Sequence, residues 1–267
     1  MRRIFTALVA ALSLSLPASV TFAATCGNTS SGFEAWKADF ARTAQANGIR
    51  QSGLNALAQS QYASKTISAD RNQKSFKYSL DKFMEIRGAN VIASQGRKRK
   101  AANPQFYASL ERVYGVPAGV LITIHGMETG FGRFMGDSQV VSAIVTLAYD
   151  CRRSDFFVPH ALGALKLIDM GSITTQTVGA RHGELGHTQF LPGNALRYGV
   201  DGNGDGRVDF YNEWDALAST ANFLRQKGWQ PGQPYNEGTR NFRVLNEWNA
   251  ATVYQQAIAL VAARIDG

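Results

Sequence analysis

Apolar side chains recur every three or four residues through much of residues 32–110. This spacing places them on one face of an α-helix. We therefore expect the stretch to be mostly helical, with these side chains in the core. Two runs illustrate the spacing: Phe33, Trp36 and Phe40, and Leu80, Phe83 and Met84.

A more deeply buried helix is expected after residues 114–117, Tyr-Gly-Val-Pro. The glycine is typical of a helix end, and the proline is typical of the first turn of the next helix. Residues 120–124 have scarcely a polar break, which predicts burial on most sides. This helix runs into residues 126–132, Gly-Met-Glu-Thr-Gly-Phe-Gly, which contain Glu128.

The rest of the chain predicts a mainly α protein with minor β structure (α+β). Gly, Asn and Asp cluster over residues 179–209, which indicates loops and at most a few short strands. No repeat, low-complexity tract or linker is visible, so one compact unit is expected. Further helices are predicted at residues 140–147, 161–170, 214–227 and 250–265.

The N-terminus has the pattern of a signal peptide. Arg2 and Arg3 precede an apolar run over residues 4–16, and small residues follow at 23 and 24. The alternative, a membrane anchor, needs about 18 apolar residues. We expect residues 1–23 to be removed and residues 24–267 to be exported or periplasmic, with no transmembrane segment. A lipoprotein is not expected, because Thr25 precedes Cys26 where a lipobox has a small residue.

The mature chain keeps two cysteines, Cys26 and Cys151. An oxidising compartment would let them pair if their Cα atoms come within about 7 Å. The alternative is an exposed Cys26 and a buried, unpaired Cys151. The sequence does not choose between the two.

The chain is basic, with a formal net charge of +8, and removal of Arg2 and Arg3 leaves +6. A basic surface suits an acidic polymer. For an exported protein the candidates are peptidoglycan, anionic lipid and extracellular nucleic acid, and charge alone does not choose among them. The basic run at residues 97–100 is interpreted as a solvated face.

Glu128 is the candidate for catalysis. A carboxylate at the end of an apolar helix is partly removed from water, which favours its neutral form. Such a group can protonate a glycosidic oxygen, and the glycines at 126, 130 and 132 leave room for a polymer. The alternative is a surface residue at a helix end, where the helix dipole mildly disfavours a negative charge. The local segment leaves both open.

Residues 186–192, Gly-His-Thr-Gln-Phe-Leu-Pro, combine hydrogen-bonding side chains with an aromatic ring, and the proline is interpreted as the stop of this run. Sugars bind in this manner, with rings packed on pyranoses and amides reading hydroxyl and acetamido groups. The alternative is an ordinary polar turn. His187 fits a structural hydrogen-bonding role better than a catalytic one.

Residues 201–209 match the calcium-loop pattern of oxygen donors at positions one, three and five, glycine at six and a backbone carbonyl at seven. Position twelve is Asn212, so Glu213 or Asp215 has to supply the missing carboxylate. We expect a weak Ca²⁺ site, on the order of 10⁻⁴ to 10⁻³ M. The alternative is an Asx-rich turn without metal. The predicted donors are Asp201, Asn203, Asp205, Arg207 (through its carbonyl) and Asp215.

Together these segments resemble the lytic transglycosylase B family of the lysozyme-like superfamily. The resemblance runs from residue 114 to 228, with a weaker echo at 242–249, and it rests on four motifs in the family's order. It implies a lysozyme-like helical core over about 114–230, a helical N-terminal part over about 32–110 and a C-terminal helical part over about 240–267, with the calcium-loop-like insertion in the core.

The resemblance also implies an activity: cleavage of the β-1,4 MurNAc–GlcNAc bond of peptidoglycan strands with formation of 1,6-anhydro-MurNAc ends. The partner is then the glycan strand rather than nucleic acid, no cofactor is required beyond a candidate structural Ca²⁺, and a monomer is favoured. Glu128 becomes the single acid/base. The residues carried over as substrate-binding are Gln189, Arg152, Arg153, Phe156, Phe190, Trp248 and Asn249. A hydrolytic muramidase and a non-catalytic wall-binding protein remain alternatives.

Two residues depart from the family pattern. His125 stands where an apolar or aromatic side chain is usual, and Glu184 stands where a small alanine is common. Glu184 is interpreted as a loop charge. The alternative is the second carboxylate of a hydrolase, which requires a separation of roughly 5–9 Å from Glu128.

Overall fold

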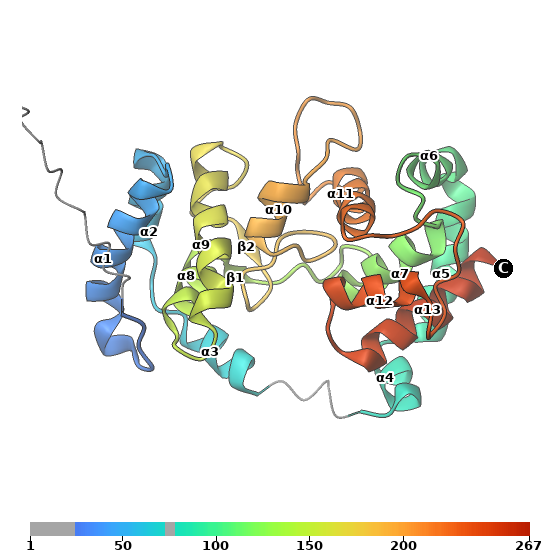
Figure 1. Ribbon diagram of the computed structural model, residues 1–267, viewed down its shortest axis with the longest axis horizontal. Coiled ribbons are helices and arrows are strands. Elements are labelled where there is room, and N and C mark those ends of the chain that lie inside the picture. Colours follow the sequence, from blue (N-terminus) through green and yellow to red (C-terminus); the bar gives the residue numbers. More distant parts are fainter. Residues whose placement is uncertain (1–24, 73–77) are drawn as a thin grey trace, which may run out of the picture.

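The computed structural model describes residues 25–72 and 78–267 and arranges their helices in two groups along the long axis of the molecule (Figure 1). The predicted signal peptide, residues 1–23, lies outside the described residues. The smaller group has its own apolar core, built on Phe33, Trp36 and Phe40 and on the apolar faces of two later helices. Its helices are α1 (Phe33–Ala46), α2 (Gln51–Gln59), α3 (Ser64–Arg71), α8 (Val140–Tyr149) and α9 (Ser154–Asp169).

The larger group surrounds α7 (Ala118–Thr129). This helix packs against α5 (Ala89–Ala102) and α13 (Thr252–Asp266). The apolar sequence of α7 explains this central position, since every residue of the helix except Glu128 is buried. The predicted N-terminal part, 32–110, is divided, because α1–α3 join the smaller group and the following helices join this one. The helices around α7 are α4 (Leu80–Ile86), α5 (Ala89–Ala102), α6 (Pro104–Tyr114), α11 (Glu213–Gln226), α12 (Arg240–Trp248) and α13 (Thr252–Asp266).

The segment between the groups contains the only regular strands among the described residues. β1 (Ser138–Gln139) and β2 (Val178–Gly179) pair antiparallel, with Ser138 opposite Gly179. The prediction of a mainly α protein with minor β is confirmed. The expectation of loops throughout 179–209 was wrong in one place, since α10 (Pro192–Tyr198) begins at the proline that we interpreted as a stop. Proline is well suited to a first helical position, where its missing N–H has no partner to lose.

The two cysteines form a disulfide bond, with Cα atoms 5.0 Å apart. The bond holds the N-terminal segment against the end of α8, where Gly27 N–H also donates to the Tyr149 carbonyl at 3.0 Å. Helix α9 starts at Ser154, seven residues before the predicted helix, and contains Pro159.

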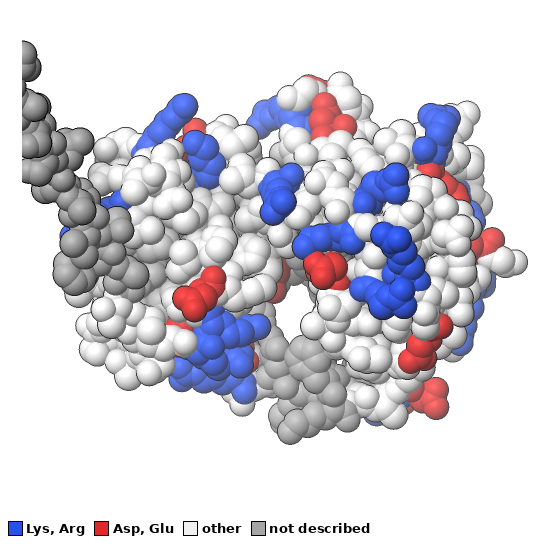
Figure 2. All heavy atoms as spheres, viewed as in Figure 1, with Lys and Arg blue, Asp and Glu red and all other residues white. Residues whose placement is uncertain are grey.

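Lys and Arg side chains lie on both groups of helices and on both sides of a hollow between them (Figure 2). The basic run at 97–100 is not simply solvated, because Arg99 pairs with Glu213 and Lys100 with Asp266. Within residues 25–72 and 78–267, no helix has the length and apolar character needed to cross a bilayer.

Candidate active site

Glu128 lies in the last turn of α7. The helix ends at Gly130, two residues later, whose backbone has the left-handed αL conformation. Two further residues with positive φ follow, Phe131 at 64° and Gly132 at 85°. A Cβ at position 132 would lie 2.4 Å from the His187 ring, so only glycine fits there. This tight turn leaves Glu128 half-buried, while its neighbours in the helix are buried.

Two side chains from the C-terminal helices donate to the same oxygen of Glu128. The Tyr254 hydroxyl donates to Oε1 at 2.5 Å and the Trp248 indole N–H donates to Oε1 at 3.2 Å. Burial raises the pKa of Glu128, the two hydrogen bonds and the charge of Arg87 oppose that rise, and the charge of Glu184 adds to it. The pKa remains above its ordinary value, which suits a group that must arrive protonated.

Glu128 faces a cleft of about 280 Å³. Four of the predicted substrate-binding residues line this cleft with it: Gln189, Phe190, Trp248 and Asn249. Glu184 also lines it, from the loop between β2 and the 186–192 segment. The remaining lining residues are Ala180, Leu191, Asn194, Phe223 and Glu247.

The 186–192 segment is a tight loop, held by reciprocal backbone hydrogen bonds between Leu185 and Phe190 at 2.8 and 3.0 Å. Gln189 at its tip has a positive φ of 57°, and its amide donates to the Gly186 carbonyl at 2.7 Å. Phe190 is 1% exposed and packs edge-on against Trp248, with ring centroids 5.3 Å apart. Phe190 therefore supports the Trp248 side chain, and both residues line the cleft.

A pair of histidines joins this loop to α7. The nitrogens His125 Nε2 and His187 Nδ1 are 2.9 Å apart, and the Thr129 hydroxyl donates to the His187 carbonyl at 2.7 Å. Burial, above all, lowers the pKa of His125 to about 3 and also lowers that of His187. One ring must donate and the other accept, so at least one is neutral, and the lowered pKa values favour the neutral form of both. The contact fixes the Gln189 loop relative to Glu128.

Comparison with known proteins identifies the family. Residues 32–239 match the family model described as transglycosylase SLT domain. The chain belongs to this lytic transglycosylase family.

Over 123 residues the chain is 33% identical to the membrane-bound lytic murein transglycosylase B of Escherichia coli K12. That match covers 45% of this chain and 34% of the relative, so the chain spans about a third of the relative's length. Among solved structures, SltB3 of Pseudomonas aeruginosa in complex with NAG-anhNAM-pentapeptide is 28% identical, with a TM-score of 0.78 over 88% of this chain and 80% of that one.

The fold is shared more widely than the sequence. SltB1 of Pseudomonas aeruginosa is 22% identical, with a TM-score of 0.77 over 86% of this chain and 97% of that one. These likenesses confirm the expected lysozyme-like helical core.

Three of the predicted substrate-binding residues of the SLT domain lie outside the cleft: Arg152, Arg153 and Phe156. Arg152 Nε donates to the buried Asp70 carboxylate at 2.7 Å, and Arg153 pairs with the same carboxylate. Phe156 is 51% exposed, with the Arg153 guanidinium near its ring. The arginines thus bind α3 to the start of α9, and this pairing was not predicted.

The calcium-like loop uses its carboxylates to hold its own backbone. Asp201 accepts backbone N–H groups from residues 204–206, at 2.7 to 3.2 Å. Asp215 is buried and accepts from Gly202, Asn203 and Asp209. Among the described residues, no group of three or more His, Cys, Asp or Glu side chains converges as a metal site.

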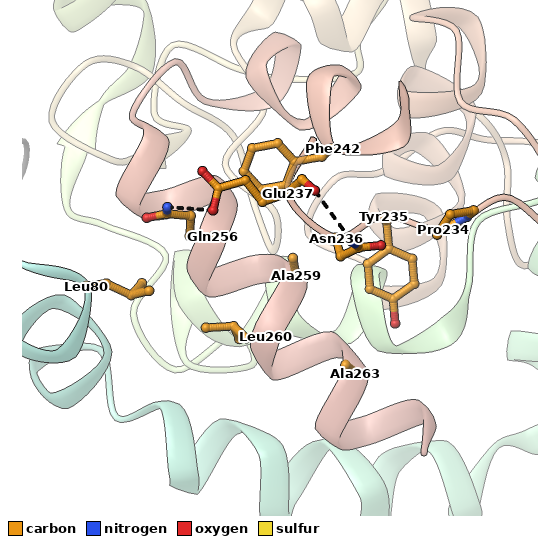
Figure 3. Close-up of a pocket in the computed structure, with 10 residues that line it drawn as sticks. All are labelled: Leu80, Pro234, Tyr235, Asn236, Glu237, Phe242, Gln256, Ala259, Leu260 and Ala263. Carbon is orange, nitrogen blue, oxygen red and sulfur yellow. Dashed lines mark hydrogen bonds between the residues drawn. The ribbon is translucent and has the colours of Figure 1, made fainter. Parts of the chain in front are cut away.

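A second cavity, of about 350 Å³, lies between α13 and the 234–237 segment (Figure 3). Its walls are mostly apolar, with Phe242, Ala259 and Leu260 among them, and it shares no lining residue with the Glu128 cleft. Glu237 at its rim accepts a hydrogen bond from Gln256 (Figure 3). The one carboxylate among its described lining residues is thus Glu237, which is paired with Gln256.

Sequence reasoning missed Tyr254 and Arg87. Both, like Trp248, limit the rise in the pKa of Glu128. Tyr254 lies 126 residues after Glu128, in a helix whose other buried residues are mostly apolar. Its only sequence signal was a phenol among aliphatic core positions, and such a hydroxyl requires a partner when buried.

Proposed function

We propose that this protein is a lytic transglycosylase that cleaves the β-1,4 bond between MurNAc and GlcNAc in peptidoglycan strands, leaving 1,6-anhydro-MurNAc ends. The observation that carries the proposal is Glu128, a half-buried carboxyl group with a raised pKa, facing a cleft and held by Tyr254 and Trp248. Membership of the transglycosylase family supports it, as does the peptidoglycan fragment bound by the 28% identical SltB3.

The reaction proceeds in two proton transfers at one carboxyl group. Protonated Glu128 gives its proton to the oxygen that leaves with GlcNAc as the C1–O4 bond breaks. The MurNAc C6 hydroxyl then bonds to C1, and its proton returns to the Glu128 carboxylate. Atoms balance without water, and neither step involves a cofactor.

The cleft residues supply the substrate contacts in this proposal. The amides of Gln189 and Asn249 suit sugar hydroxyl and acetamido groups, and Trp248, supported from below by Phe190, suits a pyranose face. Arg152 and Arg153 keep partly exposed side chains, so they can meet a carboxylate of the stem peptide beyond the cleft.

We also propose a structural Ca²⁺ on the 201–209 loop. The loop has the required glycine at position six with a φ of 86°, and its oxygen donors are Asp201, Asn203, Asp205 and the Arg207 carbonyl. Asp215 already accepts three backbone N–H groups and closes the loop from behind. The ion would stiffen the loop, none of whose residues lines the Glu128 cleft.

The proposed location is the periplasm or cell exterior, in cell-wall turnover. The signal-peptide pattern predicted over residues 1–23 supports export, and a disulfide bond fits an oxidising compartment. A monomer is proposed.

Digestion of purified sacculi tests the function. The proposal expects release of anhydro-muropeptides, each lighter by one water than the product of hydrolysis. Products that carry the extra water would instead identify a muramidase. Binding to sacculi without any release would identify a non-catalytic wall-binding protein.

A further inference from the structure

Glu184 is fixed in the cleft that contains Glu128. Its Oε2 accepts the backbone N–H of His182 at 3.0 Å, and its Oε1 lies 3.3 Å from His182 Nδ1. Its carbonyl accepts the Ala180 N–H at 3.0 Å, and its side chain is only 21% exposed. A carboxylate held at both oxygens cannot swing freely into solvent.

The support behind Glu184 continues into the smaller group of helices. His182 Nε2 lies 3.8 Å from Oδ1 of Asp70, the buried carboxylate that also pairs with Arg152 and Arg153. The cleft is thus lined by Glu128 at the end of α7 and by Glu184, whose support reaches α3 through His182 and Asp70.

Glu184 and Glu128 line the same cleft, and the negative charge of Glu184 acts on Glu128. Among the described residues that line the cleft, none is a lysine or arginine, and the other exposed carboxylate, Glu247, pairs with Lys227 at 2.7 Å. The groups acting on Glu128 are Tyr254 from α13, Trp248 from α12, Arg87 after α4, and Glu184 itself.

We propose that Glu184 serves the reaction as a second carboxylate that transfers no proton, whose fixed negative charge stabilises the positive charge developing on the sugar's anomeric carbon. The transition state of glycosidic cleavage is oxocarbenium-like. A charge fixed in advance stabilises such a state without the cost of reorganising solvent. The inference rests on the proposed function only in assuming that a glycosidic bond is cleaved at Glu128.

The same charge acts on Glu128 before the reaction. It contributes to the raised pKa of that carboxyl group, so it helps Glu128 to arrive protonated. Removing the charge should therefore lower the rate of bond cleavage. It should also lower the pKa of Glu128, so that activity is lost at a lower pH on the alkaline side of the pH profile.

The test compares wild-type protein, Glu184→Gln and Glu184→Asp on soluble glycan strands, counting every bond cleaved, whichever product forms. Gln keeps an oxygen that can accept the His182 N–H but lacks the charge, and Asp keeps the charge on a shorter side chain. We expect Glu184→Gln to lower kcat by about 10- to 100-fold with little change in KM, to shift the alkaline limit to lower pH, and to be partly rescued in Glu184→Asp. Asp137→Asn is the matched control, because it removes the same charge from an 81% exposed side chain outside the cleft.

A Glu184→Gln protein with wild-type kcat and an unmoved alkaline limit would overturn the inference, and so would a change confined to KM. Mass spectrometry of the same digests tests the proposed function separately. Hydrated products would refute the transglycosylase reaction and leave the effect of Glu184 on rate to be decided by kcat. Failure of the wild-type protein to cleave any strand would refute both.

Discussion

The hydroxyl of Tyr254 donates a 2.5 Å hydrogen bond to Oε1 of Glu128, and 126 residues separate the two along the chain. The bond stabilises the ionised form of Glu128 and so limits the rise in pKa that burial causes. It also holds the carboxyl group in one orientation between α7 and α13. The orientation and the pKa of the Glu128 carboxyl group therefore depend on α13 as well as on α7.

Tyr254→Phe should raise the pKa of Glu128 further, because the ionised form loses a donor. The alkaline limit of activity then moves to higher pH, opposite to the shift expected for Glu184→Gln. The maximal rate should fall on the order of tenfold or more, since a hydrogen bond to a charged group contributes about 1.5–3 kcal/mol. A pH–rate profile on soluble glycan strands measures both effects.

Tyr107→Phe is the control for that experiment. Tyr107 is equally buried on α6, and its hydroxyl makes no hydrogen bond within the described chain. This variant should keep the wild-type profile. A Tyr254→Phe profile that matches it would contradict the role assigned to the Tyr254 hydroxyl.

His125 makes stability depend on pH. Its pKa is about 3 in the folded protein and about 6.5 in an unfolded chain, so the unfolded chain binds more protons below pH 6.5. Stability is therefore lost as pH falls between those values, by about 2 kcal/mol from pH 7 to 5 for this residue. His125→Gln, which keeps a hydrogen-bonding side chain, should show a shallower fall in denaturant midpoint over that range. His160 and His187 remain and keep the slope from vanishing. Parallel curves for the two proteins would contradict the prediction.

The disulfide bond closes a long loop, since Cys26 and Cys151 are 125 residues apart. Its reduction should lower the free energy of unfolding by roughly 2–5 kcal/mol. Urea titrations with and without dithiothreitol measure this loss, and the Cys26→Ser/Cys151→Ser protein, which should not respond to the reductant, is the control. A midpoint that dithiothreitol leaves unchanged in the wild-type protein would show that the bond adds nothing.

Millimolar Ca²⁺ should raise the melting temperature if the 201–209 loop binds it, because a ligand specific to the folded state stabilises that state. Asp201→Asn should remove this response without changing the products released from sacculi. Magnesium is the comparison ion, as it is poorly suited to such a flexible loop. Equal melting temperatures in EDTA and in 5 mM calcium, a concentration on the order of several times the expected Kd, would argue for a metal-free turn.

The sequence predicted those elements whose structure depends on residues close together along the chain. The apolar run before Glu128 predicted a buried helix with a carboxyl group at its end, and both are present. The proline at 192 was misinterpreted because the same residue suits a helix start and a stop, and only the tertiary setting decides. The cleft loop with Gln189 was found by its motif.

Long-range partners could not be predicted in the same way. Nothing near Asp70 indicates that it pairs with Arg152 and Arg153 some 80 residues later. Phe190 was assigned to a sugar-binding surface as the aromatic ring of its motif, and the motif gave no sign that this ring is buried edge-on against Trp248. Pairings of this kind depend on how the two groups of helices pack together, which no short segment encodes.

The most direct test of the account compares wild-type protein and Glu128→Gln on purified sacculi, with circular dichroism to show that both are folded. Gln can still accept from Tyr254 and Trp248 but cannot transfer the proton. The account predicts that the wild-type protein releases anhydro-muropeptides and that Glu128→Gln releases them at least about 100-fold more slowly. Release by folded Glu128→Gln at a rate near that of the wild-type protein would contradict it.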